Sequence, residues 1–270
     1  MTTRENVMGS DPLLQDKAFS FVRVAPRPVK PRPYGITVIA DRGWGMNRVN
    51  DVLDMAGEYI DWCKIGIGAF RLQSEDFLRK KIEAFHKHGV KVFFAGDLTE
   101  AAMLQGVSKE FYAEVKRLGS DGVEVSSAQV SMSLDDKCNL IKMAKDAGLT
   151  VIGEAGQKGK DSWTNSQAYI YKQTDAFFKA GAWKVLYQGE GITEGVDTNK
   201  EDLLMNIAAH YDIKDVIFQA KDGKAQGWFI STLGNGVNLD IDDDQIIDVE
   251  LMRRNIRKRN LFGLIASSGN

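Results

Sequence analysis

The stretch from Thr150 to Lys158 ends an apolar run in a carboxylate, Glu154, and places a lysine four residues beyond it. The run is too short for a helix and predicts a buried strand. Gly156 and Gly159 then allow the backbone to turn sharply. Glu154 and Lys158 are therefore expected near the carboxyl end of a strand, where parallel α/β folds bind their ligands.

Charged and amide side chains end the other predicted strands as well. They are Asp41 with Arg42, Lys64, Asp97 with Glu100, Glu124 with Ser126, Gln188 with Glu190, Gln219 with Lys221, and Asn238 with Asp240. Oxygen ligands from several strands suit Mg²⁺, which also takes oxygens from substrate and water. Lysines beside carboxylates suit anion binding or proton donation, because neighbouring charges tune the lysine pKa.

Several of these residues also have a purely structural interpretation. Asp41 is placed where it could serve as the N-cap of the next helix. Lys64 and Glu154 could simply pair inside the fold, although charged groups on buried strands are costly without a function. Lys158 could be a solvated loop lysine. The three histidines lie late in helical patterns and predict surface residues, not metal ligands.

Strand and helix patterns alternate along the chain. Apolar runs predict strands over residues 35–41, 59–66, 90–97, 121–126, 150–154, 184–188, 215–219 and 237–241. Helical spacing predicts helices over residues 47–57, 74–88, 108–118, 134–147, 165–180, 200–211, 226–233 and 243–259. Eight such units indicate a closed parallel (β/α)₈ TIM barrel. An open doubly wound sheet is the alternative, but no Gly-x-Gly-x-x-Gly turn follows the first strand.

The prolines divide the chain into an arm and one barrel domain. All five lie before residue 34. We therefore expect an extended arm over residues 1–33 and the barrel over residues 34–270. The arm is either a disordered tail or a strap across a neighbouring subunit, because chain ends are poorly ordered unless they are docked.

Composition limits the partners and the compartment. The 270 residues are 43% hydrophobic and carry a net charge of −2, so neither a nucleic acid nor an anionic membrane is expected as a partner. Two cysteines are too few for a disulfide framework, and they favour a reducing cytoplasm. We find no stretch long and apolar enough to span a bilayer.

Motifs spread from residue 30 to about residue 260 combine into one pattern. They are Lys30-Pro-Arg-Pro-Tyr-Gly-Ile-Thr37, Gly57-Glu-Tyr-Ile-Asp61, Lys64-Ile-Gly66, Val123-Glu-Val-Ser126, Glu154-Ala-Gly-Gln-Lys158 and Val237-Asn-Leu239. Together they resemble the phosphosulfolactate synthase family. The resemblance implies an oligomeric, Mg²⁺-dependent barrel enzyme that adds sulfite to phosphoenolpyruvate, an early step of coenzyme M biosynthesis.

The resemblance also implies roles for individual residues. Lys158 matches the general acid, with Glu154 and Lys64 as its catalytic partners. Glu124 and Glu154 would hold Mg²⁺, and Asp41 is a further candidate ligand. For substrate binding we expect Arg42, Ser126, Lys221, Gln226 and Asn238.

Several loops depart from the family pattern. Phe94-Ala-Gly-Asp97 stands in place of Pro-Gly-Gly-Thr, and Gln188-Gly-Glu190 stands where the family has Glu-x-Arg. Losing an arginine and gaining a carboxylate weakens a pocket for anions. Three functions therefore stay open: the synthase itself, a related lyase or synthase acting on another enol or hydroxy acid, and a non-catalytic stress-associated barrel protein.

Overall fold

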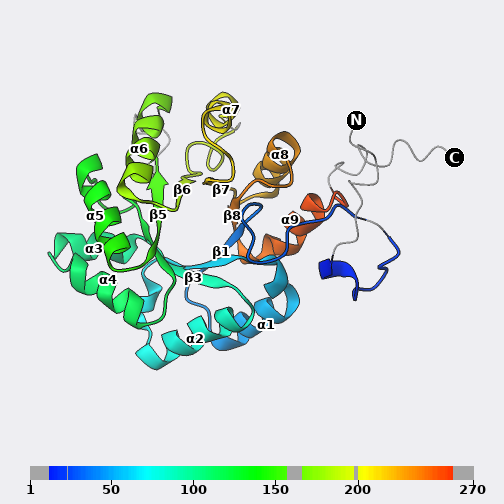
Figure 1. The fold of residues 1–270 in the computed structure, drawn as a ribbon, viewed down its shortest axis with the longest axis horizontal. Helices are drawn as coiled ribbons and strands as arrows, with labels where there is room; N and C mark the ends of the chain where they lie inside the picture. The colour runs from blue at the N-terminus through cyan, green and yellow to red at the C-terminus, as the bar shows by residue number, and fades with distance from the viewer. Residues whose placement is uncertain (1–11, 23, 157–165, 198–199, 258–270) are drawn as a thin grey trace.

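Eight parallel strands close into a barrel in the computed structural model, which describes residues 12–22, 24–156, 166–197 and 200–257 (Figure 1). The strands pair in sequence order, and β8 returns to β1. They are β1 (Thr37–Asp41), β2 (Trp62–Ile65), β3 (Lys91–Phe94), β4 (Gly122–Val125), β5 (Thr150–Ala155), β6 (Lys184–Tyr187), β7 (Val216–Gln219) and β8 (Leu239–Ile241). The predicted (β/α)₈ barrel is confirmed.

Helices surround the strands and follow them along the chain. They are α1 (Met46–Ala56), α2 (Glu75–Lys87), α3 (Asp97–Leu104), α4 (Ser108–Arg117), α5 (Leu134–Asp146), α6 (Gln167–Ala180), α7 (Glu201–His210), α8 (Gly223–Leu233) and α9 (Ile246–Arg253), with a short 3₁₀ turn, η6 (Asp243–Gln245), before α9. The prediction missed α3: Asp97 begins this helix instead of ending the third strand, because β3 already stops at Phe94.

Apolar side chains form two layers, one inside the barrel and one between the barrel and its helices. The inner cluster is Ile36, Val38, Trp62, Phe93, Ile152, Leu186 and Ile217. The outer cluster includes the alternate strand positions, such as Ile39, Cys63 and Val123. Successive side chains of a strand point to opposite faces of the sheet. A residue that follows one in the outer layer therefore points into the barrel, and a residue that follows one in the inner layer points toward the helices.

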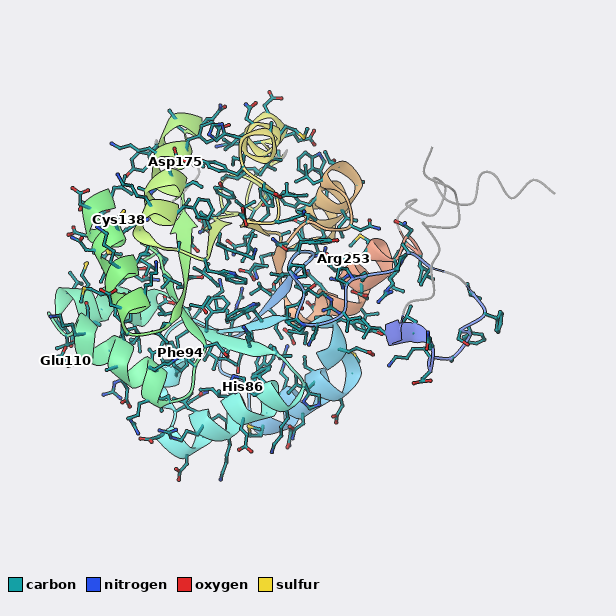
Figure 2. The ribbon with its side chains drawn as sticks, in the orientation of Figure 1. His86, Phe94, Glu110, Cys138, Asp175 and Arg253 are labelled. Carbon is teal, nitrogen blue, oxygen red and sulfur yellow. The ribbon has the colours of Figure 1, made fainter. Side chains whose placement is uncertain are left out.

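Residues 24–33 of the arm pack against the base of this chain's own barrel. The buried guanidinium of Arg32 donates to Asp61 at 2.9 Å. The same carboxylate accepts the backbone N–H of Thr37 at 2.9 Å. Arg253, labelled in Figure 2, donates to the carbonyl of Val237 at 2.6 Å.

Among the described residues, no helix is both long and apolar enough to cross a bilayer.

Candidate active site at the carboxyl end of the barrel

Four ionisable side chains point into the barrel at its carboxyl end. On β4, Val123 and Val125 belong to the outer layer, so Glu124 between them faces inward. The same alternation turns Lys64 on β2, Glu154 on β5 and Asp240 on β8 toward the barrel axis. The site therefore follows from strand periodicity applied to a closed barrel.

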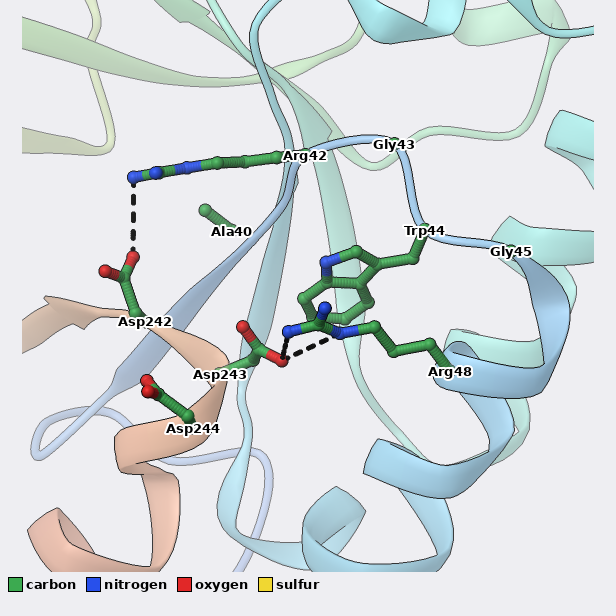
Figure 3. Close-up of a pocket in the computed structure, with 9 residues that line it drawn as sticks. All are labelled: Ala40, Arg42, Gly43, Trp44, Gly45, Arg48, Asp242, Asp243 and Asp244. Carbon is green, nitrogen blue, oxygen red and sulfur yellow. Dashed lines mark hydrogen bonds and ion pairs between the residues drawn. The ribbon is translucent and has the colours of Figure 1, made fainter.

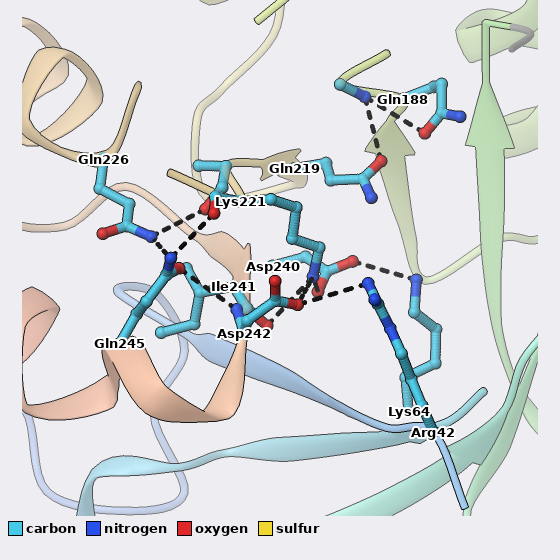
Figure 4. A network of polar contacts seen from close by, with 12 residues as sticks. Arg42, Lys64, Gln188, Gln219, Lys221, Gln226, Asp240, Ile241, Asp242 and Gln245 are labelled. Atoms are coloured by element: carbon cyan, nitrogen blue, oxygen red, sulfur yellow. Dashed lines mark hydrogen bonds and ion pairs between the residues drawn. The ribbon is translucent and has the colours of Figure 1, made fainter. Parts of the chain in front are cut away.

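These charges form a connected network around two ammonium groups (Figure 4). Nζ of Lys64 lies 3.2 Å from Glu124 and 3.0 Å from Asp240. Nζ of Lys221, from the loop after β7, lies 2.6 Å from the other oxygen of Asp240 and donates to the carbonyl of Ile241 at 3.0 Å. Asp240 is fully buried and bridges the two lysines.

The network sets the protonation states of its members. Burial lowers the pKa of Lys64, but the carboxylates of Asp240, Glu124 and Glu154 raise it more, so the net direction is upward. Burial raises the pKa of Asp240, and the two lysines lower it below its ordinary value. At neutral pH the site therefore holds Lys64 as an ammonium and Asp240 as a carboxylate.

Glu154 lies at the inner wall, 7% exposed, and its strand is held from behind by two side chains of the outer layer. Nζ of Lys137 on α5 donates to the carbonyl of Glu154 at 3.5 Å, and Gln173 on α6 accepts the N–H of Gly156 at 2.9 Å. These contacts fix where the chain leaves β5. Lys158, the expected general acid, lies outside the described residues.

Asp41 is a correction to the expected metal ligands. It is the last residue of β1, but the strand alternation turns it outward, away from the barrel axis. Its carboxylate pairs with Lys81 on α2 at 2.6 Å, with both side chains fully buried. It also accepts the backbone N–H groups of Gly43 at 2.7 Å and Trp44 at 2.6 Å. Asp41 therefore ties a strand to a helix and orders a turn.

Asn238 is a second correction, because it lies at the opposite end of the barrel from the site. β8 begins only at Leu239, so Asn238 precedes the strand. Its amide donates to the carbonyl of Val216 at 2.8 Å and accepts the N–H of Ile36 at 2.9 Å. These groups belong to the amino ends of β7 and β1, and Asn238 closes the base of the barrel.

Two further candidates for substrate binding are occupied by protein contacts. Ser126 is 2% exposed, and its hydroxyl donates to Glu100 at 2.8 Å. Gln226 is fully buried and donates to the carbonyl of Ala220 at 3.0 Å and to Gln245. Both side chains are buried and hold loops around the mouth of the barrel, so neither is exposed to a ligand in the mouth.

Arg42 does reach the mouth, beside a polar cavity of about 560 Å³ (Figure 3). Its side chain is 56% exposed and lies 3.5 Å from Asp242. Arg48 on α1 pairs with Asp243 at 2.5 Å across the same cavity. Arg42 is therefore a long, exposed cationic side chain at the rim of the mouth, within reach of an incoming anion.

The mouth offers the carboxylate oxygens that Mg²⁺ prefers as ligands. Glu124 and Glu154 are inward carboxylates on adjacent strands, and Mg²⁺ is commonly held by one or two carboxylates together with waters and substrate oxygens. Among the described residues, no group of three or more histidine, cysteine or acidic side chains is placed to enclose an ion. The protein would therefore supply part of the coordination shell and the substrate another part.

Sequence reasoning missed one carboxyl group of the mouth, that of Glu194 in the loop between β6 and α7. Burial raises its pKa, and the charges of Lys221, Asp240, Asp242 and Asp222 also act on it. The glycine-rich loop gives no periodic signal, so only the folded chain shows that this side chain turns toward β7 and β8.

The fold defines a (β/α)₈-barrel protein, and its charged side chains gather at the carboxyl ends of the strands, the end at which barrels of this kind carry their active sites. The family model for (2R)-phospho-3-sulfolactate synthase (ComA) matches residues 25–259, and the chain belongs to this family.

Relatives of known name agree with that assignment. The chain is 35% identical to phosphosulfolactate synthase of Methanocaldococcus jannaschii, over 83% of this chain and 92% of the relative. It is 30% identical to phosphosulfolactate synthase of Methanothermobacter thermautotrophicus, over 89% and 96%. It is also 25% identical to Protein HEAT-STRESS-ASSOCIATED 32 of Arabidopsis thaliana, over 87% and 91%.

Solved structures support the fold alone. Orotidine 5'-phosphate decarboxylase from Pyrococcus horikoshii superposes with a TM-score of 0.56 at 12% identity, covering 83% of this chain and 99% of that one. A truncated 3-deoxy-D-arabino-heptulosonate 7-phosphate synthase from Thermotoga maritima gives a TM-score of 0.53 at 12% identity, covering 87% and 88%. Identities this low carry no functional argument.

Proposed function

We propose that this chain catalyses the addition of sulfite to phosphoenolpyruvate, giving phosphosulfolactate. The observation that carries the proposal is the network of Lys64, Glu124 and Asp240 at the ligand-binding end of a barrel whose chain belongs to the synthase family. Lys64 stays positively charged in this network, and a fixed cation reduces the repulsion between two anionic reactants.

The proposed reaction joins sulfur to carbon in two steps. The sulfur lone pair of sulfite attacks the methylene carbon of phosphoenolpyruvate, and the electrons of the carbon–carbon double bond move onto the carboxylate as an enediolate. Mg²⁺ held by Glu124 and Glu154 would supply Lewis-acid stabilisation of that charge. Lys158 then donates a proton to the carbon that bears the phosphate, and solvent restores the ammonium group.

The remaining residues bind and orient. Lys221, fixed by Asp240, presents a second ammonium group inside the mouth. Arg42 extends from the rim and attracts anions before they enter. Glu100 orders the loop behind Ser126 and so defines one wall of the site. These roles belong to the proposal and follow from position and charge.

The direct test is to incubate the protein with phosphoenolpyruvate, sulfite and Mg²⁺ and to follow phosphorus NMR. A new phosphoester signal is expected, and its absence would reject the synthase reaction. Lys158→Ala should lower the rate by at least about 100-fold, the usual contribution of a general acid. Lys160→Ala, two residues further along the same segment, is the matched control and should keep the wild-type rate.

A second candidate is a related lyase or synthase acting on another enol or hydroxy acid. The carboxylates of Asp97 and Glu190 favour it, because they add negative charge to loops around the mouth. A thermal-shift screen of small phosphorylated and sulfonated acids separates the two. Stabilisation by a different acid, together with none by phosphoenolpyruvate, would select the second candidate.

A further inference from the structure

Glu194 carries a buried carboxyl oxygen that no described residue engages. Oε1 of Glu194 is shielded from solvent and has no hydrogen-bond partner among the residues that the structure describes. The residue as a whole is only partly buried, and the charges that act on its carboxyl group come from Lys221, Asp240 and Asp242 at the mouth. Unsatisfied buried polar groups are rare in native proteins, and one of the accepted reasons for them is a functional role.

The loop backbone holds this carboxyl group in place. The carbonyl of Gly189 accepts the N–H groups of Ile192 at 2.9 Å, Thr193 at 2.8 Å and Glu194 at 2.9 Å, which winds the loop tightly. A Cβ atom added at Gly189 would overlap the carboxyl group of Glu194. The absence of a side chain at position 189 therefore makes the room in which this carboxyl group lies.

Burial favours the protonated form of Glu194, and the one nearby cation that opposes it is shared with other carboxylates. Lys221 is the nearby cation, but its ammonium group already lies 2.6 Å from Asp240 and 3.5 Å from Asp242. Burial raises the pKa of Glu194, Lys221 lowers it, and Asp240, Asp242 and Asp222 raise it again. The carboxyl group thus takes up a proton more readily than an exposed glutamate does.

We propose that Glu194 is a substrate-binding residue that donates a hydrogen bond from its carboxyl O–H to an oxygen of the anionic substrate. A protonated carboxyl group donates one hydrogen bond, whereas a carboxylate only accepts. Glu194 therefore acts as a neutral hydrogen-bond donor. The described part of its loop, residues 188–197, contains no lysine, arginine or histidine that could bind the anion instead. The expected ligand is a small acid with carboxylate and phosphate or sulfonate groups. This choice of ligand rests on the proposed function, whereas the role of Glu194 as a donor does not.

Proton-linked binding is the measurable consequence. An ionised Glu194 repels the anion, so binding takes up a proton and the affinity falls as pH rises, by up to about tenfold per pH unit above the carboxyl pKa. Titration calorimetry with phosphoenolpyruvate and with 3-sulfolactate, in buffers of different ionisation enthalpy, measures both effects. Sulfolactate has no group that titrates near neutral pH, so any proton it draws comes from the protein.

Two variants and a control test the role of Glu194. Glu194→Gln keeps a donor at every pH, so its affinity for 3-sulfolactate should not vary with pH and binding of this anion should take up no proton. Gly189→Ala should displace the carboxyl group and weaken the pH dependence as well. Asp197→Asn, at an exposed position of the same loop, should behave like the wild type.

Three results would overturn the inference: wild-type affinity that does not change with pH, unchanged proton uptake in Glu194→Gln, or no binding of either anion at any pH. Binding that is proton-linked in the wild type and not in Glu194→Gln, in a protein that forms no phosphosulfolactate, would count against the proposed reaction and leave the role of Glu194 standing.

Discussion

Lys64 is the residue on which the charged network depends, since it contacts carboxylates of two different strands. Its raised pKa means that its stabilising effect is complete below the unfolded pKa and is lost only as pH rises through the folded value, far above neutrality. The lowered pKa of Asp240 gives a contribution that is present above the unfolded pKa and is lost as pH falls. Both residues therefore stabilise the folded state across the neutral pH range.

Replacing Lys64 with methionine should destabilise the protein by about 3 kcal/mol, because two buried carboxylates then lose a partner. Urea unfolding at neutral pH measures the change. Lys87→Met is the matched control, because Lys87 forms an exposed pair with Glu83 and its side chain is 69% exposed. A similar small change in both variants would show that the network contributes little to folding.

At the scale of elements, α3 organises the loop between β4 and α5 through a single buried carboxylate. Glu100 on α3 is fully buried and accepts the N–H groups of Ala128, Gln129 and Val130, each at 2.8 Å. It also accepts the hydroxyl of Ser126. One side chain of a helix thus substitutes for the secondary structure that the loop lacks.

Glu100→Ala should therefore destabilise the protein by about 3 kcal/mol and loosen residues 126–130, because several buried donors lose their acceptor. Hydrogen exchange of these amides should become faster, while the amides of β1 keep their protection. Glu110→Ala, at an exposed position on α4, should leave both stability and exchange unchanged. Normal exchange in Glu100→Ala would contradict the proposed support.

At the scale of the whole molecule, the arm joins the base of the barrel through several cations. Lys30 donates to the carbonyl of Gly57 at 2.6 Å and to that of His88 at 3.2 Å, so it links the arm to the ends of α1 and α2. Burial lowers the pKa of Lys30 from its ordinary value of 10.5 to about 8. Keeping this ammonium group charged therefore costs free energy at neutral pH.

The wild type should gain stability relative to Lys30→Met as pH rises from about 8 to about 10.5. In this window the unfolded chain binds more protons than the folded one, which makes the free energy of unfolding increase with pH. Urea unfolding at several pH values measures the difference. An exposed lysine variant, Lys109→Met, should show no such trend, and a constant offset for Lys30→Met would disprove the linkage.

The order of elements could be predicted from local patterns, because apolar runs, helical spacing and glycine positions each depend on neighbours along the chain. These patterns were enough for the closed barrel and for placing Lys64, Glu124 and Glu154 on its strands. Helix α3 was missed because only Ala95 and Gly96 separate it from β3, and the predicted strand was extended to Asp97.

The sequence by itself determined which residues end the strands, since chain order alone sets that. Only the tertiary structure decided which way each one points. Asp41 faces the helices and Asp240 faces the axis, although both are carboxylates within the last two residues of a strand. Asn238 closes the base because the pairing of β8 with β1 and β7 sets where that strand begins. Register and barrel closure are long-range properties, and a shift of one residue reverses every side chain.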